Sequence, residues 1–87
     1  MADFTKDSAA VLDYSVNWSA WLNGDTISES TWLAPGLTID SESETTTATT
    51  VWLSGGRAGT TYKITNNIVT DGGRTDERSL TIDVVNK

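Results

Sequence analysis

The chain has 87 residues, of which 12 are acidic and 6 are basic, a formal net charge of -6, and this length accommodates one domain with one hydrophobic core but not two. Because it has no histidine and no cysteine, the usual catalytic bases and nucleophiles are absent and no disulfide can form, so we expect neither an enzyme nor a cofactor. Its basic residues are scattered and no apolar run approaches the length of a membrane span, so we expect no nucleic-acid partner and no membrane partner.

Strand-forming residues dominate the chain, since Thr, Val, Ile, Trp and Tyr recur at a spacing of two, and no stretch has the apolar period of an amphipathic helix. The chain is therefore predicted to be all-β. Residues 1–10 are polar and are predicted to form an N-terminal arm, with residues 11–87 as a single domain. No secretory signal pattern opens the sequence, and the absence of cysteine fits folding in a reducing cytosol.

The first strand is predicted near residues 11–22. Alternation along it places Tyr14, Val16 and Trp18 on one face, which we expect to be the core face. Trp21 has the opposite parity in the same strand. The Asn-Gly pair in the segment 23–25 then predicts a turn.

A second strand is predicted near residues 26–33 and ends at Pro35-Gly36, after which Leu37 and Ile39 begin a third. The threonine-rich segment 41–50 allows two interpretations, a disordered tract or a strand with one wet face that continues toward Trp52. The β-branched threonines favour the strand.

The C-terminal part predicts a hairpin, with a long strand at 61–70, a turn at Asp71-Gly72-Gly73, and a last strand near 77–85. In total the chain has six or seven short strands joined by turn-type loops. This number and spacing predict a small antiparallel β-sandwich of the immunoglobulin-like or fibronectin type III-like kind without a disulfide.

A tyrosine corner is predicted near the start of the long strand. Leu53, a glycine-bearing corner at 54–59 and then Tyr62 follow the order seen in such sandwiches, where the hydroxyl bonds back to the backbone of the corner. Tyr62 is therefore interpreted as structural.

The four tryptophans separate by their positions in the predicted strands. Trp18 is assigned to the core with Tyr14. Trp21 and Trp52 take the side opposite to their apolar neighbours, so we expect them to form an exposed aromatic patch of the kind that marks a partner site. Trp32 follows a polar run that is out of phase with Ile27, which suggests a bulge and leaves its side open.

Two charged segments are candidates for further roles. Asp40, Glu42 and Glu44 alternate, so they either gather oxygen ligands for calcium or form a solvated or charge-protected strand edge, and the second interpretation is favoured. The cluster Arg74-Thr75-Asp76-Glu77-Arg78 forms either ordinary surface pairs or the polar rim of an interface between subunits. The protein-interface candidates are Trp21, Trp52, Arg74, Asp76, Glu77 and Arg78.

Several short motifs follow one another along most of the chain: LDYSVNWSAWL at 12–22, GDTI at 24–27, STW at 30–32, VWLSGG at 51–56, AGTTY at 58–62 and GRTDERS at 73–79. In this order they resemble small virion proteins of tailed bacteriophages described as fibre-to-tail adaptors. That family has no catalytic residues to carry over.

The resemblance implies a structural component of the phage particle that is assembled in the host cytoplasm, with several copies of the protein in a symmetric assembly. Its partners would be other phage structural proteins of the neck, tail, fibres or capsid. Two alternatives stay open: a decoration protein of the capsid head, and a carbohydrate-binding β-sandwich module that stacks sugars on exposed tryptophans. Copy number per particle and glycan binding would separate them.

Overall fold

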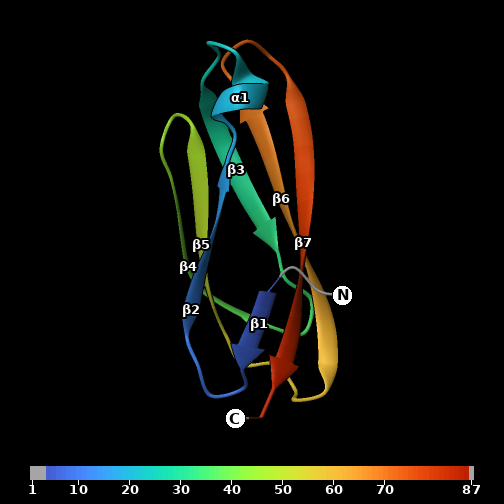
Figure 1. The fold of residues 1–87 in the computed structure, drawn as a ribbon. Coiled ribbons are helices and arrows are strands. Elements are labelled where there is room, and N and C mark those ends of the chain that lie inside the picture. Colours follow the sequence, from blue (N-terminus) through green and yellow to red (C-terminus); the bar gives the residue numbers. More distant parts are fainter. Residues whose placement is uncertain (1–3, 87) are drawn as a thin grey trace.

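The computed structural model describes residues 4–86 and consists of two facing β-sheets with one helical turn at their end (Figure 1). This confirms the predicted all-β sandwich. Its elements are β1 (Phe4–Asp7), β2 (Leu12–Asn17), α1 (Ser19–Leu22), β3 (Ile27–Leu33), β4 (Thr38–Glu44), β5 (Ala48–Ser54), β6 (Thr60–Thr70) and β7 (Thr75–Val85).

The strand order is β1-β7-β6-β3 in one sheet and β2-β5-β4 in the other. Apart from β1, this is the arrangement of an immunoglobulin-like sandwich, in which the second, fifth and fourth strands face the seventh, sixth and third. All strand pairs are antiparallel except β1 with β7, which is parallel. The first strand therefore pairs in the sheet opposite β2, and not beside β2.

The predicted N-terminal arm is corrected for residues 4–7, because they form β1 and pair with β7. The polar composition of this segment does not indicate a strand, because its inward-facing side chain is a lysine, which is fully buried. Lys6 donates from its ammonium to the carbonyl oxygens of Asp7 at 2.9 Å and Gly55 at 2.8 Å. A lysine can be buried in this way when its stem packs against apolar groups and its head finds acceptors. Residues 1–3 of the predicted arm lie outside the described residues.

The first predicted strand is shorter than expected. It ends at Asn17, and α1 follows from Ser19. Trp18 already has helical dihedral angles (φ -95°, ψ -1°), and the turn closes at Asn23, whose left-handed conformation (φ 46°) is one that asparagine tolerates. Since period-two parity ends where the strand ends, the predicted position of Trp21 on the outer face of a strand is wrong.

The threonine-rich segment 41–50 is not one strand. It forms the end of β4, a turn at residues 45–47 and the start of β5. The Thr45 hydroxyl accepts hydrogen bonds from the N–H groups of Thr47 and Ala48, which fixes the turn. Threonine side chains make such local bonds readily, so the same residue type that favours a strand also provides its break.

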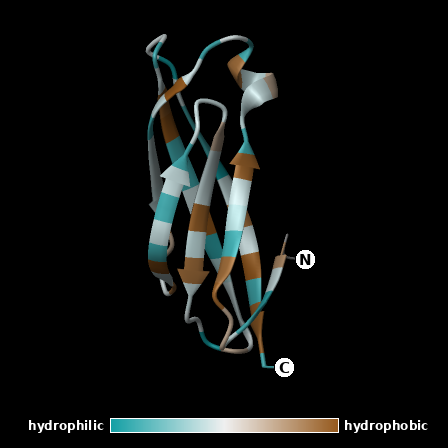
Figure 2. Cartoon of the chain, turned by 90° about the vertical axis from the view of Figure 1, so that its left-hand side faces the viewer, coloured by the Kyte–Doolittle hydropathy of each residue, from teal (hydrophilic) through white to brown (hydrophobic). Residues whose placement is uncertain are grey.

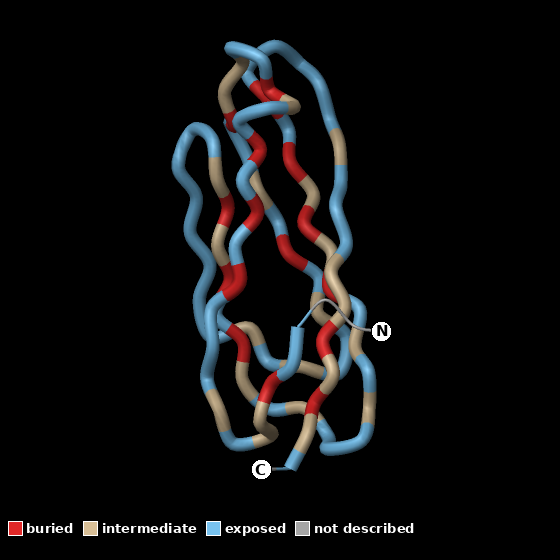
Figure 3. Tube along the Cα trace, in the orientation of Figure 1, coloured by how far each residue is buried: buried red, intermediate tan, exposed pale blue. Residues whose placement is uncertain are grey.

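The core lies between the two sheets, and buried residues alternate with less buried ones along β2, β5 and β6 (Figures 2 and 3). Tyr14, Val16 and Trp18 are buried there, as predicted. Trp32 is also buried, at 5% exposure. The register of β3 against β6 shifts between Ile27 and Glu29, which confirms the predicted bulge and turns the rest of β3 so that Trp32 faces inward.

Asn66 is the centre of a polar network inside this core. Its side-chain oxygen accepts hydrogen bonds from the Trp18 indole N–H at 3.0 Å and the Thr49 hydroxyl at 2.6 Å. Its amide nitrogen donates to the Ser30 hydroxyl at 2.9 Å and the Thr31 carbonyl at 3.0 Å. Because these partners come from both sheets, the network fixes how the sheets sit on each other.

The tyrosine corner is present. The Tyr62 hydroxyl accepts a hydrogen bond from the backbone N–H of Arg57 at 2.8 Å, as the sequence predicts. The ring lies over Gly36, where a Cβ atom would come within 2.5 Å of the ring carbon Cε1. Glycine at this position, with φ of 86°, therefore permits both the turn and the close approach of the tyrosine.

Candidate interaction surfaces

The first candidate surface is the outer face of the β2-β5-β4 sheet, around Trp52. The indole lies between Asp13 of β2 and Ser41 of β4 in the register of the sheet and is 41% exposed. We call the six outward residues of its two central rows the Trp52 face: Asp13, Ser15, Ser41, Ser43, Thr50 and Trp52.

The Trp52 face consists mainly of small hydroxyl-bearing side chains around one large aromatic ring. In the second row the hydroxyls of Ser15 and Thr50 are hydrogen-bonded at 2.9 Å. Asp13 is its one charged residue, although the chain as a whole carries a net charge of -6. Its central exposed tryptophan and its low charge are two features of protein contacts, where aromatic anchors are enriched and charges are depleted.

The second candidate surface is the end of the sandwich that α1 closes. We call it the α1 end and define it by Trp18, Trp21, Asp25, Arg74 and Arg78. The rings of Trp18 and Trp21 meet edge to face with centroids 5.5 Å apart. The guanidinium of Arg74 lies 4.5 Å from the centre of the Trp21 ring, and that of Arg78 lies 4.4 Å from the centre of the Trp18 ring. Such cation–π contacts tie the β6–β7 hairpin to the tryptophan-rich stretch.

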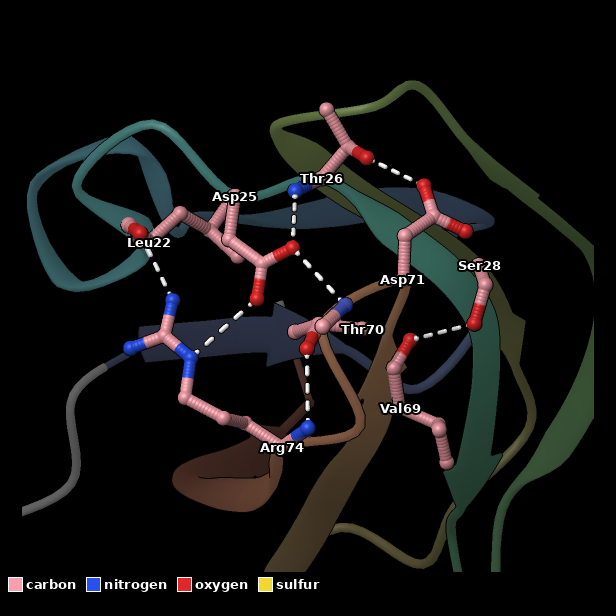
Figure 4. Close-up of polar contacts among 9 residues, drawn as sticks. Leu22, Asp25, Thr26, Ser28, Val69, Thr70, Asp71 and Arg74 are labelled. Carbon is pink, nitrogen blue, oxygen red and sulfur yellow. Dashed lines mark hydrogen bonds and ion pairs between the residues drawn. The ribbon is translucent and has the colours of Figure 1, made fainter.

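Asp25 is the hydrogen-bonding centre of the α1 end (Figure 4). Its carboxylate accepts bonds from the N–H groups of Thr26 at 2.8 Å and Gly72 at 3.1 Å and from Arg74 Nε at 3.1 Å. A hydrogen bond from the Thr70 side chain, with these bonds to Thr26, Arg74 and Gly72, lowers the pKa of Asp25 to about 2.

Neighbouring bonds complete this junction. Arg74 also donates to the Leu22 carbonyl at 2.6 Å, and the Thr26 hydroxyl donates to the Asp71 carboxylate (Figure 4). Sequence reasoning placed Asp25 in a turn but missed this role. Its signal was an acid beside an Asn-Gly turn, while its partners Gly72 and Arg74 lie more than 40 residues away in the chain.

The charged hairpin contacts the tryptophan-rich stretch through its two arginines. Arg74 and Arg78 turn toward α1, and Arg78 Nη1 also lies 3.5 Å from the Asn17 carbonyl oxygen. Asp76 accepts a bond from the N–H of Glu77 at 2.8 Å, and the Glu77 side chain is exposed. Adjacent residues of a strand point to opposite sides, so of the two acids Glu77 is the exposed one and Asp76 is half-buried.

Trp21 and Trp52 do not form one patch. Trp21 is half-buried in the α1 end, whereas Trp52 lies opposite Asp13, four residues before the last residue of β2. Four residues of a strand span about 13 Å, so the two side chains belong to separate surfaces. The expectation of a joint aromatic patch is therefore corrected, because it assumed that both residues lay in strands.

The acidic residues Asp40, Glu42 and Glu44 lie on β4, which is an edge strand. The register of β4 shifts between Ile39 and Ser41, so Asp40 occupies a bulge and no longer alternates with the other two. Among residues 4–86, no group of three or more potential ligands is placed to hold a metal ion. A bulge with acidic side chains is a common protection of a sheet edge.

Within the described part of the chain, no helix is both long and apolar enough to cross a membrane.

Comparison with known proteins identifies the family. No curated protein matches the chain. A family model described as Podophage GP4 fiber-tail adaptor protein gp77 matches residues 6–83, which is nearly the whole sandwich. The chain therefore belongs to this family of podophage fiber-tail adaptor proteins.

Proposed function

We propose that the protein is a non-enzymatic adaptor that connects the neck or tail of a phage particle to its fibres through protein–protein contacts. Several copies act in a symmetric assembly that forms in the host cytoplasm and remains in the virion. Membership of the fiber-tail adaptor family supports the structural role. The observation that supports the contact surface is the 41% exposure of Trp52 in the centre of a nearly uncharged face.

The Trp52 face is the proposed main contact. Trp52 projects from the middle strand of its sheet, so a partner laid on this face buries the ring while the hydroxyl side chains around it exclude water. Truncating a central interface tryptophan typically costs 2 kcal/mol or more of binding free energy, about a thirtyfold loss of affinity.

The α1 end is the proposed second contact. Arg74 packs on the Trp21 ring, Arg78 packs on the Trp18 ring, and the two rings contact each other, so the partner meets a preformed surface. The exposed acid beside it is Glu77. Preformed surfaces lose little side-chain entropy on binding. We expect this end to fix the orientation of a neighbouring subunit rather than to supply most of the affinity.

The experiment is a Trp52→Ala phage, with incorporation measured as copies of the protein per purified particle. We expect a loss of at least tenfold with the unfolding midpoint of the purified variant unchanged. Leu33→Ala is the matched control, because Leu33 is 60% exposed on the other sheet and lies outside the Trp52 face. Full incorporation of the Trp52→Ala protein would show that this face is not the contact.

One observation favours carbohydrate binding as a second candidate function. Trp52 is flanked by Asp13 and by hydroxyl side chains, and an aromatic ring with hydrogen-bonding neighbours can stack on a sugar. A glycan array separates the candidates: Trp52-dependent binding of the purified protein to a bacterial surface glycan would favour the sugar. Counting copies per particle tests the head-decoration alternative, since a head lattice needs many more copies than a tail ring.

A further inference from the structure

We infer that the free edge of β2 accepts an extended segment of a different virion protein, which adds a fourth strand to the β2-β5-β4 sheet. The inference rests on the proposed adaptor function and names how one of its partners docks. Strand addition at a sheet edge supplies main-chain hydrogen bonds for affinity and side-chain positions on both faces for specificity.

The four edge strands differ in how they are protected. Strand β1 has only four residues, and β3 and β4 each contain a register shift with acidic side chains beside it. Strand β2 pairs with β5 over six residues in unbroken register, and Asp13 is its one charged residue. Short length, bulges and edge charges are the devices that prevent strand addition. Of the four edges, β2 carries the fewest of them.

Along this same edge, apolar side chains between the two sheets are incompletely covered. Because β1 pairs with β7, no strand among residues 4–86 pairs with the outer edge of β2. Phe4 packs its ring edge-on against Tyr14 at 5.0 Å, yet Phe4 remains 39% exposed and Leu12 38% exposed. Leu12 lies in phase with the buried Tyr14, so it points toward the core side of the sheet. Apolar side chains from an added strand would cover both residues.

Charge identifies the kind of segment that fits. The chain carries a net charge of -6, so a second copy would bring like charge to the edge, whereas a segment with lysine or arginine is attracted to it. Directly opposed residues of neighbouring strands lie about 5 Å apart, which places a basic residue of the incoming strand against Asp13. The occupant is thus an extended segment that alternates apolar residues, facing Phe4 and Leu12, with polar residues that include this cation.

Particles assembled without the protein are the binding probe, and purified variants are added to them. Leu12→Lys places a charge on the core side of the edge, and Asp13→Lys reverses the charge that attracts the segment. We expect each variant to bind roughly tenfold more weakly than the wild type. Leu33→Lys on the edge strand β3 is the matched control and should bind normally. Thermal melts establish that each variant is folded.

Hydrogen exchange on the wild-type protein provides a test that needs no substitution. We expect the amides of residues 12–17 to gain protection on binding to the particle, while those of β4 stay as they are. Normal binding by Asp13→Lys and unchanged exchange in β2 would overturn the inference while leaving the adaptor role intact. A wild-type protein that does not bind the particles would overturn the adaptor role itself. A wild-type dimer that Leu12→Lys dissociates would identify the occupant as a second copy and contradict the inference.

Discussion

Replacing Tyr62 by phenylalanine removes a single hydroxyl and tests whether the corner between β5 and β6 depends on it. The hydroxyl accepts a hydrogen bond from the Arg57 N–H at 2.8 Å. Because Arg57 is exposed, water can replace part of the lost bond. The expected cost is therefore about 1 kcal/mol, and not above about 2. For a domain of this size, that corresponds to a fall in the melting temperature of roughly 4–8 °C.

Tyr14→Phe is the matched control, because it deletes the same hydroxyl from a buried ring. Among the described residues the Tyr14 hydroxyl has no hydrogen-bond partner. Removing an unpaired buried polar group relieves its desolvation cost, so we expect stability to stay equal or to rise by about 1 kcal/mol. Urea unfolding of both variants measures the difference. Equal stability of Tyr62→Phe and wild type, or a larger loss for Tyr14→Phe, would show that the corner does not depend on the Tyr62 hydroxyl.

Three further predictions concern the core, the acid response and the turns. Asn66→Leu keeps the number and branching of the side-chain heavy atoms but leaves the buried polar groups around it unpaired. Urea unfolding should therefore show a loss of about 2–4 kcal/mol, and an unchanged midpoint would contradict the role of the network. The pKa of Asp25 is lower in the folded state than its model value of 3.8, so the ionised carboxylate stabilises the fold fully above pH 3.8, and this contribution is lost as the pH falls toward 2. An Asp25→Asn protein should therefore show a weaker acid dependence of its melting temperature than the wild type. Gly36→Ala should destabilise by about 1–3 kcal/mol more than Gly24→Ala, since both have positive φ but only Gly36 has the Tyr62 ring within 2.5 Å of the added carbon; equal losses would count against the packing argument.

Strand interiors were predictable from the sequence because alternation is a local property. The faces of Tyr14 and Val16 follow from a spacing of two, and the bulge before Trp32 follows from the loss of phase after Ile27. The tyrosine corner was also readable, since its leucine, glycines and Tyr62 lie within ten residues. In each case the residues that make the contact are close in the chain.

Strand ends and distant pairings were not predictable in this way. The helical turn after Asn17 overrides the parity that placed Trp21. Its one local sign is Asn17, whose side-chain oxygen accepts the Ser19 N–H at 3.0 Å, and this asparagine stands inside a run of residues that otherwise favours a strand. Strand β1 owes its existence to β7 at the other end of the chain and to a lysine that finds carbonyl acceptors inside the domain. A polar segment of four residues contains no signal for such a partner.

The candidate surfaces were predictable in part. Exposure of Trp52 follows from its position between two buried residues of one strand, and the structure confirms it. The contacts of Arg74 and Arg78 with the tryptophan-rich stretch depend on a hairpin more than 50 residues away, so the sequence could not reveal that the two clusters meet. Whether these residues contact a partner remains a prediction of the proposed function.

A cryo-electron map of the intact particle would show where the protein sits and what covers Trp52. We expect copies of the protein at the junction of tail and fibres, with Trp52 buried against a different protein. A map with the copies distributed over the head shell, or with Trp52 facing solvent at the tail, would contradict this expectation.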